Sequence, residues 1–176
     1  LFKIKIFIKN TLQIEIVECN IIVHKLMLEV GVRSMDDRNC LSLDKQICFP
    51  FYAASRKVTK LYGPLLKPLG LTYTQYLLML VLWEEDDLTV GEICKRLRLD
   101  SGTITPVIKK MEKEGLVHRE RSEQDSRVVV VKLNEKGKNL EEKARDIPKK
   151  IYSCVDLPED KLKMLYEILY EFLDEE

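Results

Sequence analysis

Cys48 is the residue of this sequence with the clearest capacity for chemistry. Residues 44–66, DKQICFPFYAASRKVTKLYGPLL, have the apolar spacing of a helix. Pro50 is tolerated in a first helical turn, so the regular helix begins near Phe49 or is kinked there. In either case Cys48 lies close to a helix N-terminus, where the helix dipole favours the thiolate, the nucleophilic form of cysteine. Tyr52 lies four residues further on, one turn along the same face.

The complete set of cysteines is not typical of a metal centre or of a disulfide framework. The five are Cys19, Cys40, Cys48, Cys94 and Cys154. They form no CxxC pair and only two histidines accompany them, so we expect no metal and no cofactor. The sequence contains no secretion signal, which favours a cytoplasmic, reducing location. Two interpretations of Cys48 stay open on pattern alone, a reactive thiol and an inert core residue.

Residues 99–115 predict a short helix with a polar outer face. Asp100 or Ser101 can cap its first free N–H groups, and Pro106 lies about one turn inside, where it is tolerated. Gly115 predicts a left-handed end to the helix. The apolar positions at helical spacing are Ile104, Val107, Ile108 and Met111. The exposed face then carries hydroxyl and amino groups, on Ser101, Thr103, Thr105, Lys109 and Lys110.

The residues that follow predict a hairpin with a charged tip. Residues 116–121 and 127–133 alternate or run apolar, and the polar sequence SEQDS separates them. Residues 88–97 predict a second short helix before the first, so the order is helix, turn, helix, wing, that of a winged helix-turn-helix. Three arginines of the ribbon can reach a DNA backbone or minor groove, Arg119, Arg121 and Arg127. The alternative is a surface helix and hairpin of another α+β domain.

The distribution of charge supports a nucleic-acid surface better than the total does. The formal net charge is zero. Residues 95–133 nevertheless contain ten Lys and Arg against six Asp and Glu, a net +4, whereas residues 156–176 contain eight acids against two lysines. The difference between these segments is the informative quantity. No apolar run reaches the length of a membrane span, so we expect no membrane association.

The remaining segments predict a mainly α protein with a small β-wing, in which helices at both ends form a dimer. Residues 1–34 alternate Ile and Lys and differ from the rest, so we expect the native domain to begin at Met35, with a functional arm as the alternative. The domain, 35–176, then has a reader at about 86–133 and apolar-striped dimerisation helices at about 43–66 and 135–175. The helix of residues 73–85 is expected to be buried through Leu77, Leu78, Leu80, Val81 and Trp83.

From about residue 43 to residue 172 the chain resembles the MarR family, and within it the organic-hydroperoxide sensors of the OhrR subfamily. The general signal is GLVHRERSEQDSRVVVVKLNEKG, with the Asp125-x-Arg127 pattern in the wing and Gly137 at the start of the next helix. The subfamily signal is ICFPFYAASRKVTKLYGPLL, LTYTQYLLMLVLWE and LDSGTITPVIKKME. Residues 1–34 have no counterpart in it.

The resemblance implies a homodimeric repressor on an inverted-repeat operator in double-stranded DNA, which regulates a peroxidase gene. Cys48 matches the peroxide-sensing cysteine, and Tyr52 and Tyr62 match the tyrosines that hydrogen-bond its thiolate. Such donors stabilise the anion and lower the cysteine pKa. The matched DNA-binding positions, taken with those the pattern indicates, are Asp100, Ser101, Thr103, Thr105 and Lys109 in the recognition helix and Arg119, Arg121, Asp125 and Arg127 in the wing.

The resemblance leaves open how oxidation of Cys48 is completed. An organic hydroperoxide would give a sulfenic acid, which condenses with a second thiol. That thiol is Cys154 of the other subunit, the nearby Cys40, or a low-molecular-weight thiol.

Two further function classes compete with this one. A MarR-type repressor can instead be released by a small aromatic ligand, in a pocket lined by Tyr73, Tyr76 and Trp83. A thiol peroxidase that uses Cys48 is the enzyme alternative. The sequence shows no general base for turnover and the arginine-bearing wing would have no purpose, so we expect that the protein is not an enzyme.

Overall fold

The computed structural model describes residues 41–122, 125 and 127–174. The chain divides into two units, Leu1–Ala54 and Ser55–Glu176, so the boundary falls inside helix α2 (Cys48–Leu66). In the first unit the structure describes the 3₁₀ helix η1 (Leu43–Lys45) and the first turns of α2. The predicted leader 1–34, the start at Met35, and Cys19 and Cys40 lie outside the described residues.

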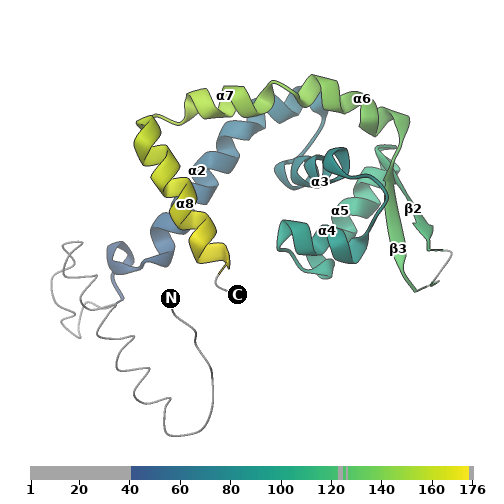
Figure 1. Cartoon of the computed structure of the whole chain (residues 1–176), viewed down its shortest axis with the longest axis horizontal. Coiled ribbons are helices and arrows are strands. Elements are labelled where there is room, and N and C mark those ends of the chain that lie inside the picture. The colour runs from purple at the N-terminus through teal and green to yellow at the C-terminus, as the bar shows by residue number, and fades with distance from the viewer. Residues whose placement is uncertain (1–40, 123–124, 126, 175–176) are drawn as a thin grey trace, which may run out of the picture. The chain divides into compact units, whose positions relative to one another are not determined.

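The second unit is mainly helical and contains one small sheet (Figure 1). After the end of α2 its elements are η2 (Lys67–Leu69), α3 (Tyr73–Glu84), β1 (Leu88–Thr89), α4 (Val90–Leu97), α5 (Ser101–Lys113), β2 (Val117–Arg121), β3 (Val129–Leu133), α6 (Glu135–Ala144), α7 (Ile147–Cys154) and α8 (Glu159–Asp174). The strands are antiparallel in the order β1-β3-β2. The predicted fold class, mainly α with a β-wing, is confirmed.

Local capping explains where the helices of the reader begin. Thr72 and Thr89 each form a capping box with the residue three positions on, Gln75 and Glu92, at the starts of α3 and α4. Each pair satisfies backbone N–H groups that a helix start otherwise leaves without a partner. Gly115 has a φ of +73°, so the predicted left-handed end after α5 is confirmed.

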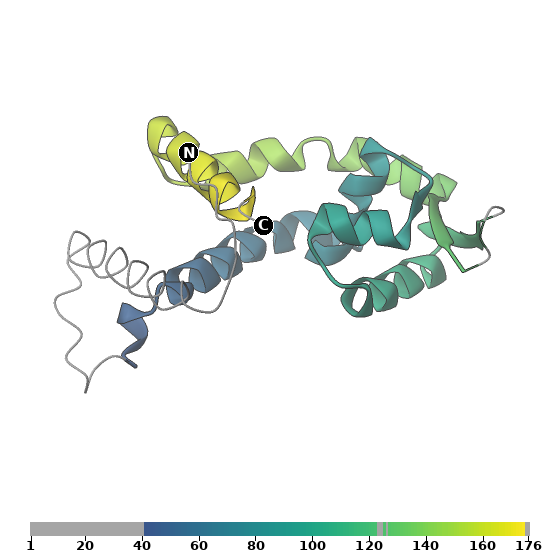
Figure 2. The same ribbon diagram turned by 60° about the horizontal axis from the view of Figure 1, so that its bottom comes forward.

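The sheet corrects one prediction. Leu88 and Thr89, expected to begin a helix, form β1 and pair with Val131 and Val130 of the central strand β3. The helix α4 starts only at Val90. The hairpin itself is as predicted, with β2 paired to β3 from Val117↔Leu133 to Arg121↔Val129. The hairpin lies at one edge of the reader in both views (Figures 1 and 2).

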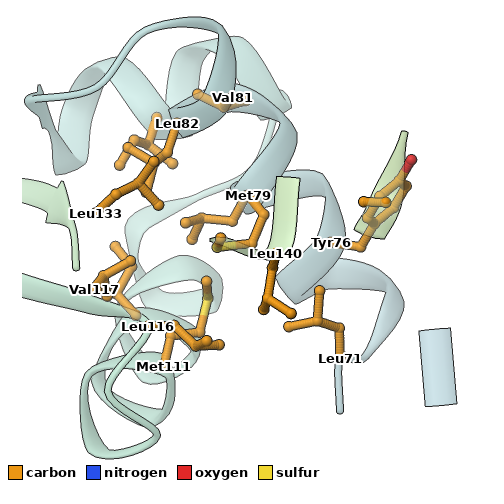
Figure 3. Packing of buried hydrophobic residues seen from close by; sticks show 14 of the residues in the cluster. Leu71, Tyr76, Met79, Val81, Leu82, Met111, Leu116, Val117, Leu133 and Leu140 are labelled. Atoms are coloured by element: carbon orange, nitrogen blue, oxygen red, sulfur yellow. The ribbon is translucent and has the colours of Figure 1, made fainter. Parts of the chain in front are cut away.

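The core of the second unit is built around α3 (Figure 3). Side chains of α3, the end of α5 and β2–β3 meet there, among them Met79, Leu82, Met111, Val117 and Leu133. The expectation for α3 was right for Leu78 and Val81 but wrong for Leu80, which is 40% exposed, and Leu77 and Trp83 are half-buried. The helix has apolar residues on all sides, so its periodicity did not reveal which side faces the core.

The segment after the wing forms two helices. The first, α6, ends at Ala144 and the second, α7, begins at Ile147. Pro148 lies in the first turn of α7, where a proline costs no hydrogen bond. At the start of α6, a Cβ atom on Gly137 would lie 2.3 Å from the carbonyl oxygen of Leu116, so only glycine fits this close approach.

Among the helices that the structure describes, none alone is long and apolar enough to cross a membrane. The consecutive segments Cys48–Leu69 and Tyr73–Glu84 pass that test of length and composition only together, with a bend of 73° between them.

Candidate nucleic-acid interface and cysteine site

The recognition helix α5 is anchored at its start by Asp100. The Asp100 carboxylate accepts hydrogen bonds from the backbone N–H of Thr103 (2.9 Å) and from its hydroxyl (2.6 Å). These two bonds, the side-chain one first, lower the pKa of Asp100 below its usual range. Both acceptor oxygens therefore serve the helix start, as expected for a capping residue.

The polar and apolar faces of α5 separate as the sequence predicted. Ile104, Ile108 and Met111 are buried against the rest of the reader. Of the candidate DNA-binding side chains on the helix, Ser101, Thr103 and Lys109 are exposed and Thr105 is half-buried. The helix thus presents two hydroxyls and an ammonium group to solvent, groups that can bind base edges and phosphates.

The turn of the wing is held by Asp125 and Arg127. The Asp125 carboxylate accepts from the Arg127 backbone N–H (2.9 Å) and from Nε (3.1 Å) and Nη2 (3.0 Å) of its guanidinium. This pairing lowers the pKa of Asp125 and raises that of Arg127. The Arg127 side chain is nevertheless 89% exposed. It therefore projects from the hairpin as a permanent positive charge.

A hollow of about 390 Å³ separates the recognition helix from the wing. Its lining consists of Thr89, Val90, Gly91, Thr105, Ile108, Arg119, Arg127, Val128 and Val129. The start of α4, the middle of α5 and the beginning of β3 therefore face one another across it, and the two predicted DNA-binding arginines Arg119 and Arg127 both border it. The other ribbon arginine, Arg121, is exposed at the end of β2.

Cys48 is the first residue of α2, as the sequence predicted. Its side chain is exposed, and so is that of Tyr52 one turn later. In the single chain Cys48 is therefore not buried, contrary to the alternative of an inert core residue. In this unit a thiol and a phenol lie at a helix start, accessible from solvent.

Tyr62, the second predicted thiolate partner, lies in the other unit and belongs to an aromatic cluster. Its ring centroid is 4.9 Å from that of Tyr73 and 5.7 Å from that of Tyr76, which in turn is 6.3 Å from Trp83. Burial raises the pKa of Tyr62 and Tyr73, and it raises the pKa of Tyr76 to about 12. These phenols therefore stay protonated, as hydrogen-bond donors, at neutral pH.

The other two cysteines of the described chain differ from each other. Cys154, the predicted resolving residue, is the last residue of α7 and is exposed. Cys94 in α4 is half-buried, and burial, with the Asp100 charge second, raises the pKa of its thiol. Cys94 is therefore the less reactive of the two by position. Across the described residues no group of three or more metal-binding side chains occurs.

Known proteins with the same pattern identify the family. Residues 60–144 match the family model of the transcriptional regulators SarA/Rot. The organic hydroperoxide resistance transcriptional regulator of Bacillus subtilis (strain 168) is 48% identical over 134 residues, which span 76% of this chain and 91% of the relative. The chain belongs to the MarR family. The predicted resemblance to an organic-hydroperoxide regulator is thereby confirmed.

Solved structures place this MarR-family chain among DNA-binding winged-helix regulators. Reduced AbfR bound to DNA matches with a TM-score of 0.63 and 37% identity, over 78% of this chain and 95% of that one. The disulfide form of AbfR matches with a TM-score of 0.54 and 35% identity, over 78% and 93%. AbfR is a protein of Staphylococcus epidermidis. The relatives are transcriptional regulators, and the chain shares their fold and family.

The structure also shows side-chain contacts in this MarR-family chain that could not be read from the sequence. Glu112 receives the guanidinium of Arg119, which the sequence analysis assigned to DNA. Gln75 is fully buried and donates to the Glu114 carboxylate (2.8 Å), which joins the start of α3 to the end of α5. A glutamine inside the apolar run YTQYLLMLVLW was the available signal, since a buried amide requires a partner. For Glu112 no local signal existed.

Proposed function

We propose that this protein is a transcriptional repressor that binds its operator while Cys48 is reduced and releases it when an organic hydroperoxide oxidises Cys48. The observation that carries the proposal is an exposed cysteine at the first residue of a helix, in a chain 48% identical to an organic hydroperoxide resistance regulator. Exposure allows a peroxide to reach the sulfur, and the helix start favours the thiolate. The family resemblance makes Tyr52 and Tyr62 the candidate donors to this anion. Tyr62 would donate from a second subunit, because it lies fourteen residues along the same helix α2 from Cys48.

The oxidation consumes one hydroperoxide for each thiolate. The Cys48 sulfur attacks the distal oxygen of ROOH, the O–O bond breaks, and the leaving alkoxide takes up a proton to become ROH. The sulfur is oxidised to the sulfenic acid and the peroxide is reduced. A second thiol then displaces hydroxide from sulfur, a disulfide forms and water leaves. Each thiol is oxidised once until a reductant restores it, and a sensor needs no more than this single event. With relatives that are transcriptional regulators, we propose a sensor and not an enzyme.

Cys154 of a second subunit supplies the second thiol, and a low-molecular-weight thiol is the alternative. Cys154 is exposed at the end of α7, so its sulfur is accessible. The α8 helix after it buries no side chain within Glu159–Asp174 and exposes a set of large apolar residues, Met164, Leu165, Tyr166, Ile168, Tyr170, Phe172 and Leu173. A homodimer would cover this surface, because exposed apolar stripes of this size are typical of interfaces.

The reader supplies the operator binding. In a two-fold dimer two copies of α5 would enter major grooves at half-sites about 34–36 Å apart, and two wings would carry Arg127 toward the minor grooves. The candidate contacts are Ser101, Thr103, Thr105 and Lys109 on α5, with Arg121 and Arg127 on the wing; Asp100 and Asp125 hold their segments in place. A disulfide between subunits would rotate the readers and spoil both contacts together. Such a repressor acts on DNA in the cytoplasm.

The deciding experiment is a non-reducing gel with intact-mass analysis, before and after one equivalent of cumene hydroperoxide. A covalent dimer that forms in the wild type but not in Cys154→Ser establishes the two-cysteine switch. A monomer heavier by one oxygen, or by one added small thiol, establishes the one-cysteine switch. Cys94→Ser is the matched control, since this half-buried thiol should leave either result unchanged. An unmodified Cys48 would overturn the sensing proposal.

Release by a small aromatic ligand has weaker support in the structure. The sequence suggested Tyr73, Tyr76 and Trp83 as its pocket. Tyr73 and Tyr76 each contact Tyr62, and Tyr76 also contacts Trp83. The hollow beside Tyr76 and Trp83 is about 250 Å³, smaller than the roughly 300–1,000 Å³ typical of ligand pockets. The polar group of Trp83 already has a partner within the chain, because its indole N–H donates to the Gly137 carbonyl (3.1 Å).

A further inference from the structure

Glu112 and Arg119 join the recognition helix to the wing through three hydrogen bonds. The Glu112 Oε2 accepts from Nε (2.9 Å) and Nη2 (2.6 Å) of the Arg119 guanidinium. The other oxygen, Oε1, accepts from the Arg119 backbone N–H (3.1 Å). We call this pair the Glu112–Arg119 clamp. It holds α5 and β2 together by side chain and backbone at once.

The clamp differs from an ordinary surface ion pair. The Arg119 and Glu112 side chains are only 30% and 33% exposed, so the contact between them replaces much of the water that would otherwise surround each charge. The hydrogen bond from the Arg119 side chain lowers the pKa of the Glu112 carboxyl below its usual range, because it favours the charged form. Planar guanidinium groups hold a carboxylate in one orientation, which a lysine does not. Moreover, β2 is an edge strand, paired on one side only, with β3.

The position of the clamp gives it influence over the DNA-binding surface. Arg119 borders the hollow between recognition helix and wing, together with Thr105 of α5 and Arg127 of the wing. A change in the angle between α5 and β2 therefore changes the spacing of Thr105 and Arg127 directly. Because DNA grooves require both elements in one geometry, small displacements cost affinity.

We propose that Arg119 is a positioning residue that sets the wing against the recognition helix through Glu112, and is not a phosphate contact. This revises the sequence expectation for Arg119 and rests on the DNA binding of the proposed function. Both arginines pair with a carboxylate, but Arg119 is 30% exposed and held by a residue of another element, whereas Arg127 pairs with Asp125 within the wing and is 89% exposed, so Arg127 is the one we assign to DNA.

The first test uses the sign of an affinity change. Glu112→Gln removes a negative charge next to the DNA-binding surface, which by electrostatics alone would strengthen binding. The clamp predicts the opposite, a loss of about tenfold, because an amide NH₂ would face the donors of Arg119. Glu120→Gln is the matched control: it deletes the same charge one residue from Arg119, but Glu120 pairs with Lys132 inside the hairpin. Affinity there should stay equal or rise.

The second test separates positioning from phosphate contact. Arg119→Lys keeps the charge but not the planar fork, so it should lose about as much affinity as Arg119→Gln. Both should lose little further affinity when combined with Glu112→Gln, because the three variants break one unit. For a phosphate contact, Arg119→Lys would bind nearly as the wild type, and Arg119→Gln would flatten the dependence of log K on log salt by about 0.9.

The binding assay uses a duplex that the wild-type protein selects from a randomised library, with circular dichroism melts to confirm that each variant is folded at the assay temperature. Binding of Glu112→Gln equal to that of Glu120→Gln would overturn the clamp. If Glu112→Gln does not fold, Arg119→Lys alone provides the test. Near-normal DNA binding by Arg119→Lys would then overturn the clamp. A wild type that selects no duplex would overturn the proposed function instead.

Discussion

The reader differs from helix α8 and the start of helix α2 in how many of its side chains are buried or hydrogen-bonded within the chain itself. In the reader, helix starts are capped, the recognition helix is joined to the wing, and residues such as Met111 are fully buried. In α8 no residue of Glu159–Asp174 is buried, and large side chains such as Met164, 61% exposed, face solvent. Phe49 and Phe51, next to Cys48 in α2, are likewise exposed.

This difference indicates a division of labour. A DNA reader has to keep one geometry, so its contacts are formed within one chain. The proposed redox switch would have to change geometry, so its elements would depend on contacts that a second chain supplies and that oxidation alters. Experiments that separate the two regions are therefore the most informative ones.

The largest effect is expected from Cys48→Ser. The variant should bind DNA within about threefold of the wild type, because no contact of the reader is touched, and it should lose the response to cumene hydroperoxide completely. Fluorescence anisotropy with labelled operator, before and after peroxide, measures both. If Cys48→Ser still released DNA on addition of peroxide, the sensing residue would lie elsewhere, and the proposed division between a reader and a cysteine switch would be wrong.

A matched pair of methionines compares the two regions next. Met111→Ala removes a fully buried side chain of the reader and should lower the free energy of unfolding by about 2–5 kcal/mol. Met164→Ala changes an exposed side chain of α8 and should instead weaken self-association. Urea melts measure the first effect and sedimentation velocity the second. Equal unfolding losses in both variants would mean that α8 is packed within its own chain.

Within the reader, Arg127→Gln should weaken operator binding by about tenfold and flatten the dependence of log K on log salt by about 0.9 for each lost phosphate contact. The control is Arg145→Gln, which removes the same charge from an exposed arginine beyond the wing. Titrations at several salt concentrations give both slopes. Two equal slopes would show that Arg127 does not contact the phosphates.

The smallest effect is expected for the dependence of stability on the ionisation of Asp100 at acidic pH. Its pKa is lowered in the folded chain, mainly by the Thr103 hydroxyl, so its contribution to stability is present above the unfolded value of about 3.9 and is lost as pH falls through the folded pKa. Asp100→Asn keeps a capping oxygen without this titration. The wild type should therefore exceed the variant in thermal stability at pH 7, and the gap should close below about pH 4. A difference in melting temperature that stays the same from pH 7 to below pH 4 would contradict the role of the ionised Asp100 carboxylate in stability.

Much of the fold could be predicted because it follows from local physics. Asp100 as a cap, Gly115 as a left-handed helix end and the hairpin after it depend on a few neighbouring residues each. The position of Cys48 at a helix start also followed from local sequence, since Pro50 limits where a helix can begin. The family resemblance then indicated which of these features belong to DNA binding.

Residue roles that depend on distant partners could not be predicted. Leu88 and Thr89 form a strand because β3, more than forty residues away, offers them an edge, and local propensity contains no trace of it. Leu80 lies outside the core because the packing direction of an all-apolar helix is decided by its neighbours. Gln75 is buried with both ends of its amide satisfied: the carbonyl accepts from the nearby Thr72 N–H, and the NH₂ group donates to the distant Glu114.

The sequence by itself determined the helices of the reader, the hairpin, their order and the placement of a thiol at a helix start, because these follow from spacing, capping and turn residues within a few positions. Only the tertiary structure decided what each charged side chain does. Arg119 and Arg127 have the same chemistry and occupy the same hairpin. Arg119 is held by Glu112 of the recognition helix, whereas Arg127 pairs with Asp125, two residues away in the wing, and stays 89% exposed. An ion pair across two elements exists only once packing has brought them together, so no local pattern encodes it.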